Sequence, residues 1–149
     1  IYDQALIFIL GDHGHPFGAY DVRVPPDLGE AGPAAASSFD RVLRSGIPLL
    51  LAKRPGDRGE LRITDAPASL ADVSATIFNE LGMENRGSGE PLFSIPADRP
   101  RERRFFHYSW KHSNWMSAYL PPLVEYRIQG HAWLASSWQA TGRVHKPGQ

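Results

Sequence analysis

The spacing of hydrophobic residues in the first half of the chain predicts strands that alternate with helices. Residues 5–10 and 47–52 are continuous apolar runs, which are typical of strands buried on both faces of a parallel sheet. Residues 34–44 carry apolar side chains at helical spacing and stop before Gly46. A strand-helix order of this kind indicates an α/β fold.

A second helix is predicted after residue 69, where Ser69 serves as the N-cap and Asp72 follows three residues later. Gly82 ends this helix. One face is apolar and is expected to be buried; it consists of Leu70, Val73, Ile77 and Leu81, with Phe78 beside it. Between the two helices, Pro55 to Gly59 forms a turn and residues 61–63 form a short strand.

The second half of the chain has a different pattern. Residues 84–104 are polar and rich in Gly and Pro, which predicts a surface excursion. Residues 105–110 form a strand, and residues 124–128 alternate with period two. Gln129 and Gly130 turn that strand into a partner over residues 131–136, which makes a hairpin. We therefore expect an α/β core over residues 1–98 and a small antiparallel tail over residues 99–149.

Asp12, His13 and Gly14 stand directly after the first apolar run. In open α/β sheets, ligands bind at the carboxyl ends of the strands. A carboxylate beside an imidazole suits a divalent metal, so we interpret Asp12 and His13 as metal ligands. The alternative is an ordinary polar turn, in which Asp bonds its own backbone. His15 is either a general acid close to the reacting group or a solvated loop residue.

Three segments together resemble the sulfatase-like branch of the alkaline phosphatase superfamily. Leu6 to Gly18 is similar to its strand followed by Asp-His-Gly, and Arg44 to Gly56 is similar to its "V-P-L-hydrophobic-P-G" strand. Ile63 to Gly82 resembles its "pvslvDiaPTlldllG" helix, with Ala75 in place of the family's proline. The resemblance extends from residue 5 to about residue 95, and residues 104–138 look like the C-terminal strands of membrane-linked members.

This resemblance implies a partial alkaline-phosphatase-like sheet with flanking helices, in an enzyme that hydrolyses or transfers a sulfate or phosphate ester. It implies a divalent metal (Zn, Mn, Mg or Ca) held in part by Asp12 and His13. The family's nucleophile and its other metal ligands lie upstream of this pair. We therefore expect the chain to be a C-terminal portion that is inactive alone, and that associates with itself or with the missing N-terminal half.

Two other functions stay open. One is a membrane enzyme that transfers phosphoethanolamine or glycerophosphate, which would place the chain in the periplasm or outside the cytoplasm. The other is a non-catalytic module that binds glycans or lipid head groups. The upstream sequence discriminates among them: Cys-x-Pro-x-Arg marks a sulfatase, Thr or Ser with membrane helices marks the transferase, and no nucleophile favours the binding module.

The remaining candidates have structural alternatives. His107 and His112 flank Trp110 and Trp115, so this group either lines a sugar or head-group pocket or consists of half-buried strand residues. The other candidates are interpreted structurally: His131 in the hairpin, His145 in a polar tail, Asp65 in a turn, Asp72 as a charge at the helix N-terminus, and Lys53 with Arg54 as a surface pair.

The charge balance argues against a nucleic-acid partner. The 16 Lys and Arg residues equal the 16 Asp and Glu residues, so the formal net charge is zero. The one basic run, Arg99 to Arg104, is predicted to be a solvated loop. The chain contains no Cys, which excludes a disulfide or a thiolate metal site within it.

Overall fold

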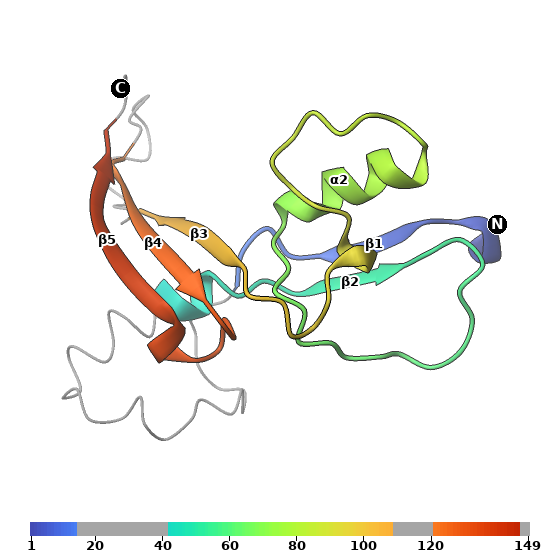
Figure 1. The fold of residues 1–149 in the computed structure, drawn as a ribbon, viewed down its shortest axis with the longest axis horizontal. Coiled ribbons are helices and arrows are strands. Elements are labelled where there is room, and N and C mark those ends of the chain that lie inside the picture. Colours follow the sequence, from blue (N-terminus) through green and yellow to red (C-terminus); the bar gives the residue numbers. More distant parts are fainter. Residues whose placement is uncertain (15–41, 109–120, 147–149) are drawn as a thin grey trace.

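The computed structural model describes residues 1–14, 42–108 and 121–146 and contains helices and two small antiparallel sheets (Figure 1). The strands are β1 (Ile7–Leu10), β2 (Leu50–Lys53), β3 (Glu102–His107), β4 (Leu123–Gln129) and β5 (Trp138–His145). The helix α2 spans Ala71–Glu80, and short 3₁₀ turns are η1 (Tyr2–Gln4), η3 (Leu92–Ser94) and η5 (Ala135–Ser137). The predicted fold class, a mixed α/β chain with an antiparallel β tail, is confirmed.

Strands β1 and β2 pair with each other, but in the antiparallel direction. Ile7 lies opposite Lys53, and Leu10 lies opposite Leu50. The prediction of a parallel sheet with both faces buried is therefore wrong for this pair. Ile9 and Leu10 are exposed. An apolar run favours a strand, but it does not fix the direction of the neighbouring strand or what covers the two faces.

The predicted helix after residue 69 is present as α2, but with a different buried face. Its buried residues are Asp72, Ala75 and Thr76, whereas Ile77 and Leu81 are exposed. The N-cap is Leu70, and no side chain caps it, so the assignment of Ser69 as the cap was wrong.

The helix predicted over residues 34–44 falls partly outside the described residues. Residues 42–45 are helical, and the amide N–H of Gly46 closes the turn by donating to the carbonyls of Val42 and Leu43, both at 3.1 Å. The strand predicted over residues 61–63 is wrong, because this segment has no regular structure and Leu61 and Ile63 are exposed.

The second sheet has the order β3-β4-β5. Phe105 lies opposite Tyr126, and Ile128 lies opposite Trp138. The predicted hairpin partner over residues 131–136 is wrong, because the chain loops through η5 before it forms β5. Gly130, at φ 91°, starts this loop, and the strand that follows ends at His145, which was predicted to lie in a polar tail.

The hydrophobic core joins the two halves of the chain. Val42 and Leu43 from the helical turn pack with Ile128 and Trp138 from the second sheet. The ring of Phe105 meets that of Trp138 edge-on at 5.5 Å. The proposed division at residue 98 stays a prediction, but the core that the structure shows draws residues from both sides of it.

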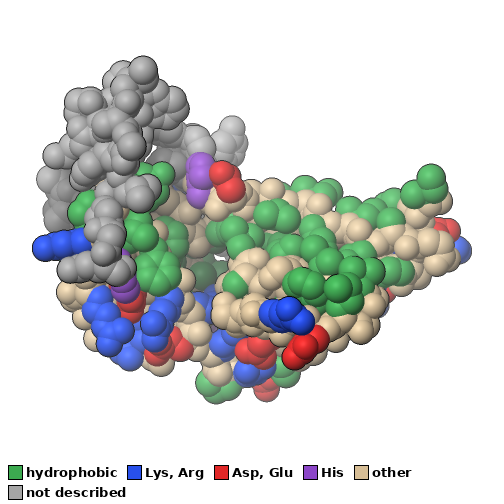
Figure 2. All heavy atoms as spheres, turned by 90° about the horizontal axis from the view of Figure 1, so that it is seen from above, with side chains coloured by type: hydrophobic (Ala, Val, Ile, Leu, Met, Phe, Trp, Pro, Cys, Tyr) green, Lys and Arg blue, Asp and Glu red, His purple; other side chains and the backbone are tan. Residues whose placement is uncertain are grey.

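Hydrophobic side chains also gather at the surface. Figure 2 shows them over the part of the molecule that holds β1, β2 and α2, seen from the α2 side. The exposed ones in this part include Ile9, Leu49, Ile77, Leu81 and Met83. Among the described residues, no helix has the length and apolar character needed to span a membrane.

Candidate functional site

Asp12 and His13 lie in a bend immediately after β1, and both side chains are open to solvent. Their exposed fractions are 92% for Asp12 and 63% for His13. The backbone N–H of His13 donates to Asp12 Oδ1 at 3.0 Å, which is a local contact between adjacent residues. This local bond fixes the carboxylate and leaves its remaining acceptor positions facing outward.

The ring of His13 is oriented by its neighbour Gly14. Its Nδ1 lies 2.6 Å from the carbonyl oxygen of Gly14, and because a carbonyl only accepts, Nδ1 carries the proton. The lone pair of the neutral ring is therefore on Nε2, as in metal-binding histidines whose other nitrogen donates to a carbonyl. The Nε2 atom lies 3.7 Å from Asp12 Oδ1. Two ligands about 2.1 Å from one tetrahedral ion stand about 3.4 Å apart, so the two atoms are close to a chelating arrangement.

Gly14 attaches this bend to the backbone of residues 44–47. It is buried, and its N–H donates to the carbonyl of Ser45 at 2.8 Å. A Cβ at this position would lie 1.8 Å from the carbonyl oxygen of Arg44 and 2.6 Å from that of Ile47. Glycine is required here by the close approach of two backbones, and not by a positive φ, since Gly14 is absent from the positive-φ glycines.

The bend opens on a broad hollow between the two sheets. Its wall includes Asp12 and His13, Gly46 beyond the helical turn, and Arg103 and His107 on β3. Within residues 1–14, 42–108 and 121–146, no group of three or more His, Asp or Glu side chains is arranged to hold a metal. The described part of the chain thus offers at most a pair of ligands.

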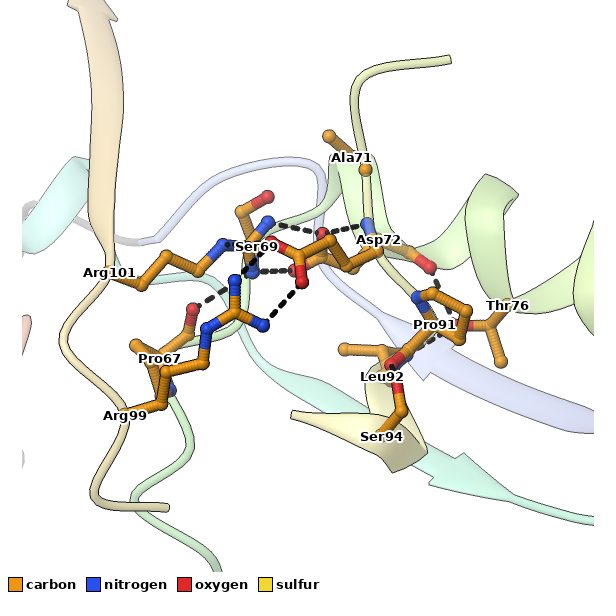
Figure 3. Close-up of polar contacts among 12 residues, drawn as sticks. Pro67, Ser69, Ala71, Asp72, Thr76, Pro91, Leu92, Ser94, Arg99 and Arg101 are labelled. Carbon is orange, nitrogen blue, oxygen red and sulfur yellow. Dashed lines mark hydrogen bonds and ion pairs between the residues drawn. The ribbon is translucent and has the colours of Figure 1, made fainter. Parts of the chain in front are cut away.

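A buried ion pair between Asp72 and Arg101 is the most elaborate polar contact described, and sequence reasoning missed it (Figure 3). The guanidinium of Arg101 donates to both carboxylate oxygens, from Nη1 to Oδ2 at 2.6 Å and from Nη2 to Oδ1 at 2.7 Å. The same carboxylate accepts the backbone N–H groups of Ser69 at 2.7 Å and Glu90 at 2.9 Å. Asp72 is completely buried, and the Arg101 side chain is 12% exposed.

The electrostatics of this pair favour the charged state. Burial alone would raise the pKa of Asp72, but the hydrogen bonds from Arg101, Glu90 and Ser69, together with the Arg101 charge, lower the pKa below 3.8. Asp72, predicted as a charge at the helix N-terminus, therefore also connects α2 with Glu90, ahead of η3, and with Arg101, which directly precedes β3. The prediction that residues 99–104 are a solvated loop is wrong, because the Arg101 side chain is only 12% exposed and Glu102 to Arg104 belong to β3.

Other predicted residues are distributed through the fold. Lys53 is partly buried, and its Nζ donates to the carbonyls of Tyr2 and Arg54 at 3.0 and 2.9 Å. Arg54 lies over the ring of Phe93 at 4.2 Å, so the pair is not a plain surface pair. Asp65 is exposed in an irregular segment.

The histidines have different surroundings. His107 lies half-buried in β3, and burial lowers its pKa. His131 stacks on Trp133. His145 is the last residue of β5, and its Nε2 lies 2.7 Å from Glu125 Oε2, so its assignment to a polar tail was wrong. His15, His112, Trp110 and Trp115 lie outside the described residues.

Comparison of the chain with protein-family models, with curated proteins and with solved structures found no match. The case for a function therefore depends on the geometry of the bend after β1 and on the residues around the hollow.

Proposed function

We propose that the chain is part of a sulfatase-like enzyme of the alkaline phosphatase superfamily, to which it contributes two ligands of a divalent metal. One observation carries the proposal: His13 Nε2 and Asp12 Oδ1 lie 3.7 Å apart, with the tautomer of His13 fixed by the Gly14 carbonyl. A structural turn needs only the bond from the His13 N–H to the Asp12 carboxylate. It does not need an imidazole whose free lone pair lies beside a carboxylate oxygen.

The residues fit such a metal in their chemistry. A neutral imidazole nitrogen and a carboxylate oxygen are ligands of Zn and Mn, whereas Ca prefers oxygen alone. The metal would act as a Lewis acid on the sulfate or phosphate ester group. Asp12 and His13 would hold it, Gly14 would fix the bend by its contact with the backbone of residues 44–47, and His15 would give a proton to the leaving oxygen. Because the described residues offer only a pair, the remaining ligands and the nucleophile come from elsewhere in the parent protein.

The test compares the metal content of the parent protein after dialysis, as wild type and as three single variants. Asp12→Ala and His13→Ala should each lose most of the bound metal, because each removes a direct ligand. His131→Ala serves as the matched control, since it removes an exposed imidazole from the loop after β4. Full metal occupancy in Asp12→Ala and His13→Ala would contradict the proposal and show that residues 12–14 form a structural turn without a role in metal binding.

A second measurement uses the chain itself. Added Mn²⁺ should broaden NMR signals of residues 12–14 more than those of the rest of the protein, with weak affinity because only two ligands are present. The effect should disappear in His13→Ala. Broadening that is equal at Asp12 and at exposed carboxylates such as Asp57 would show a nonspecific interaction and contradict the proposal.

A further inference from the structure

The loop that follows β4 is held in one conformation by the core. The indole Nε1 of Trp138 donates to the carbonyl of Ala132 at 2.6 Å, and Leu134 N–H donates to the carbonyl of His131 at 3.1 Å. Trp138 is itself buried, so this anchor belongs to the core cluster. The loop therefore presents its side chains from a fixed base.

The side chains that it presents form a stacked pair. The rings of His131 and Trp133 are 4.6 Å apart and inclined by 22°. Trp133 is 37% exposed and contributes to the wall of the hollow. An indole that is supported by an aromatic ring on one face is a rigid, flat surface, and its electron-rich π system attracts the C–H groups of a ligand ring.

A cation without a counter-ion lies beside this loop. Arg103 faces inward from β3, and its Nη2 donates to the carbonyl of Gly130, at the start of the loop. Among the described residues, no carboxylate lies within ion-pair distance of Arg103, and its Nε is buried with no hydrogen-bond partner. Burial, followed by the charge of Arg101, lowers the pKa of Arg103, and the charge of Asp72 opposes this shift. The positive charge of Arg103 is thus partly desolvated and has no carboxylate of the described residues in contact with it, a position that an anionic ligand would take.

We propose that Arg103 and Trp133 form a binding site for an acidic sugar, a pyranose ring that carries one sulfate, phosphate or carboxylate group. Trp133 packs against the apolar face of the ring, and Arg103 binds the anionic group. The Gly130 carbonyl, three residues before Trp133, connects the two through its bond with Arg103. This site goes beyond the proposed metal function and does not depend on it, because it uses other residues of the hollow.

The experiment is an NMR titration of the isotopically labelled chain. The probes are glucose 6-sulfate, glucose 6-phosphate and glucuronic acid, which distinguish the three anionic groups, with glucose and inorganic sulfate as partial ligands. At least one acidic sugar should shift the Trp133 indole signal and bind about tenfold more tightly than either partial ligand. The binding should be the same with and without EDTA, which separates the result from the fate of the metal proposal.

Two variants and one matched control complete the test. Arg103→Gln should remove the preference over glucose, and Trp133→Ala should remove the preference over inorganic sulfate. Arg127→Gln alters a residue that does not line the hollow and should change the affinity by less than about twofold. If Arg103→Gln does not fold, Arg103→Lys, which keeps the charge but not the planar fork, should still bind more weakly than wild type.

Several results would overturn the inference. Glucose 6-sulfate and inorganic sulfate binding equally well would reveal a simple anion site. Equal losses in Arg103→Gln and Arg127→Gln would reveal a general charge effect. No shift of Trp133 with any acidic sugar would reject the site altogether.

Discussion

Replacing Arg101 by Met should be among the most destabilising single changes in the described part of the chain. The variant keeps the aliphatic stem but leaves the carboxylate of Asp72 completely buried, with only the backbone donors of Ser69 and Glu90. Removing one partner of a buried pair typically costs about 3–5 kcal/mol, because the other charge is left without compensation. For a chain of this size, that corresponds to a fall in Tm of roughly 10 °C.

The loss of stability expected for Arg101→Met is larger than that expected for breaking an ion pair at the surface. Arg58 and Asp3 form an ion pair at 2.8 Å, but their side chains are 76% and 51% exposed. Arg58→Met is therefore a matched control, and it should cost less than about 1 kcal/mol. The contrast depends on burial, since both pairs have normal hydrogen-bond distances.

The pH dependence gives a second readout of the same change. The pKa of Asp72 is lowered in the folded state, so its contribution to stability is present above the unfolded value of 3.8. That contribution is lost as the pH falls through the lower folded pKa. In Arg101→Met, the hydrogen bonds and charge of Arg101 that lower the pKa of Asp72 are lost, while burial still raises that pKa. The acid-induced loss of stability should therefore begin at a higher pH than in wild type.

The assay is urea unfolding followed by circular dichroism over a pH series, for wild type, Arg101→Met, Asp72→Asn and the double variant. The double variant should be more stable than the sum of the single effects predicts, because the two residues act as one unit. The reasoning would be refuted if Arg101→Met and Arg58→Met cost the same, or if the two single effects were additive.

Three further predictions concern other contacts. Gly14→Ala should lower the free energy of unfolding by about 3 kcal/mol, because the added Cβ would lie 1.8 Å from a backbone oxygen. Gly142→Ala is the control: there is space for its Cβ, but its φ is 77°, so it should cost only about 1 kcal/mol. Equal urea midpoints for the two variants would contradict this. The hydrogen bond from His145 is the main cause of the lowered pKa of Glu125, so His145→Ala should raise that pKa, as followed by carbon NMR; an unchanged titration would rule the contact out. Leu81→Lys should weaken self-association, as measured by sedimentation velocity. It should change the free energy of unfolding by less than about 0.5 kcal/mol, because Leu81 is 65% exposed. An unaltered sedimentation coefficient would exclude the surface around Leu81 from association.

The sequence predicted the elements better than it predicted their partners. The apolar runs that became β1 and β2, the helix α2 and the strands β3 and β4 were all recognisable from local patterns. The direction of the β1–β2 pair was not, because strand direction depends on neighbours far apart in the chain. The strand β5 was missed because its residues, from Trp138 to His145, are mostly polar and exposed, without a hydrophobic alternation that would mark them.

Among the polar contacts, too, the local ones could be predicted from the sequence and the long-range ones could not. The bend at Asp12 and His13 follows from residues adjacent in sequence, and the structure has it where the pattern placed it. Asp72 was recognised as a residue of the first helical turn, but its partner Arg101 is 29 positions away, and nothing local indicates that contact. The sequence of residues 99–104 alone does not indicate which of its arginines forms an ion pair with Asp72.

The bond between Gly14 N–H and the Ser45 carbonyl brings the two ends of residues 15–41 together. Ser45 is one helical turn beyond Val42, so the chain returns close to the point where it left. A contact between residues 31 positions apart in the chain therefore holds the backbone of the bend at residues 12–14 in place.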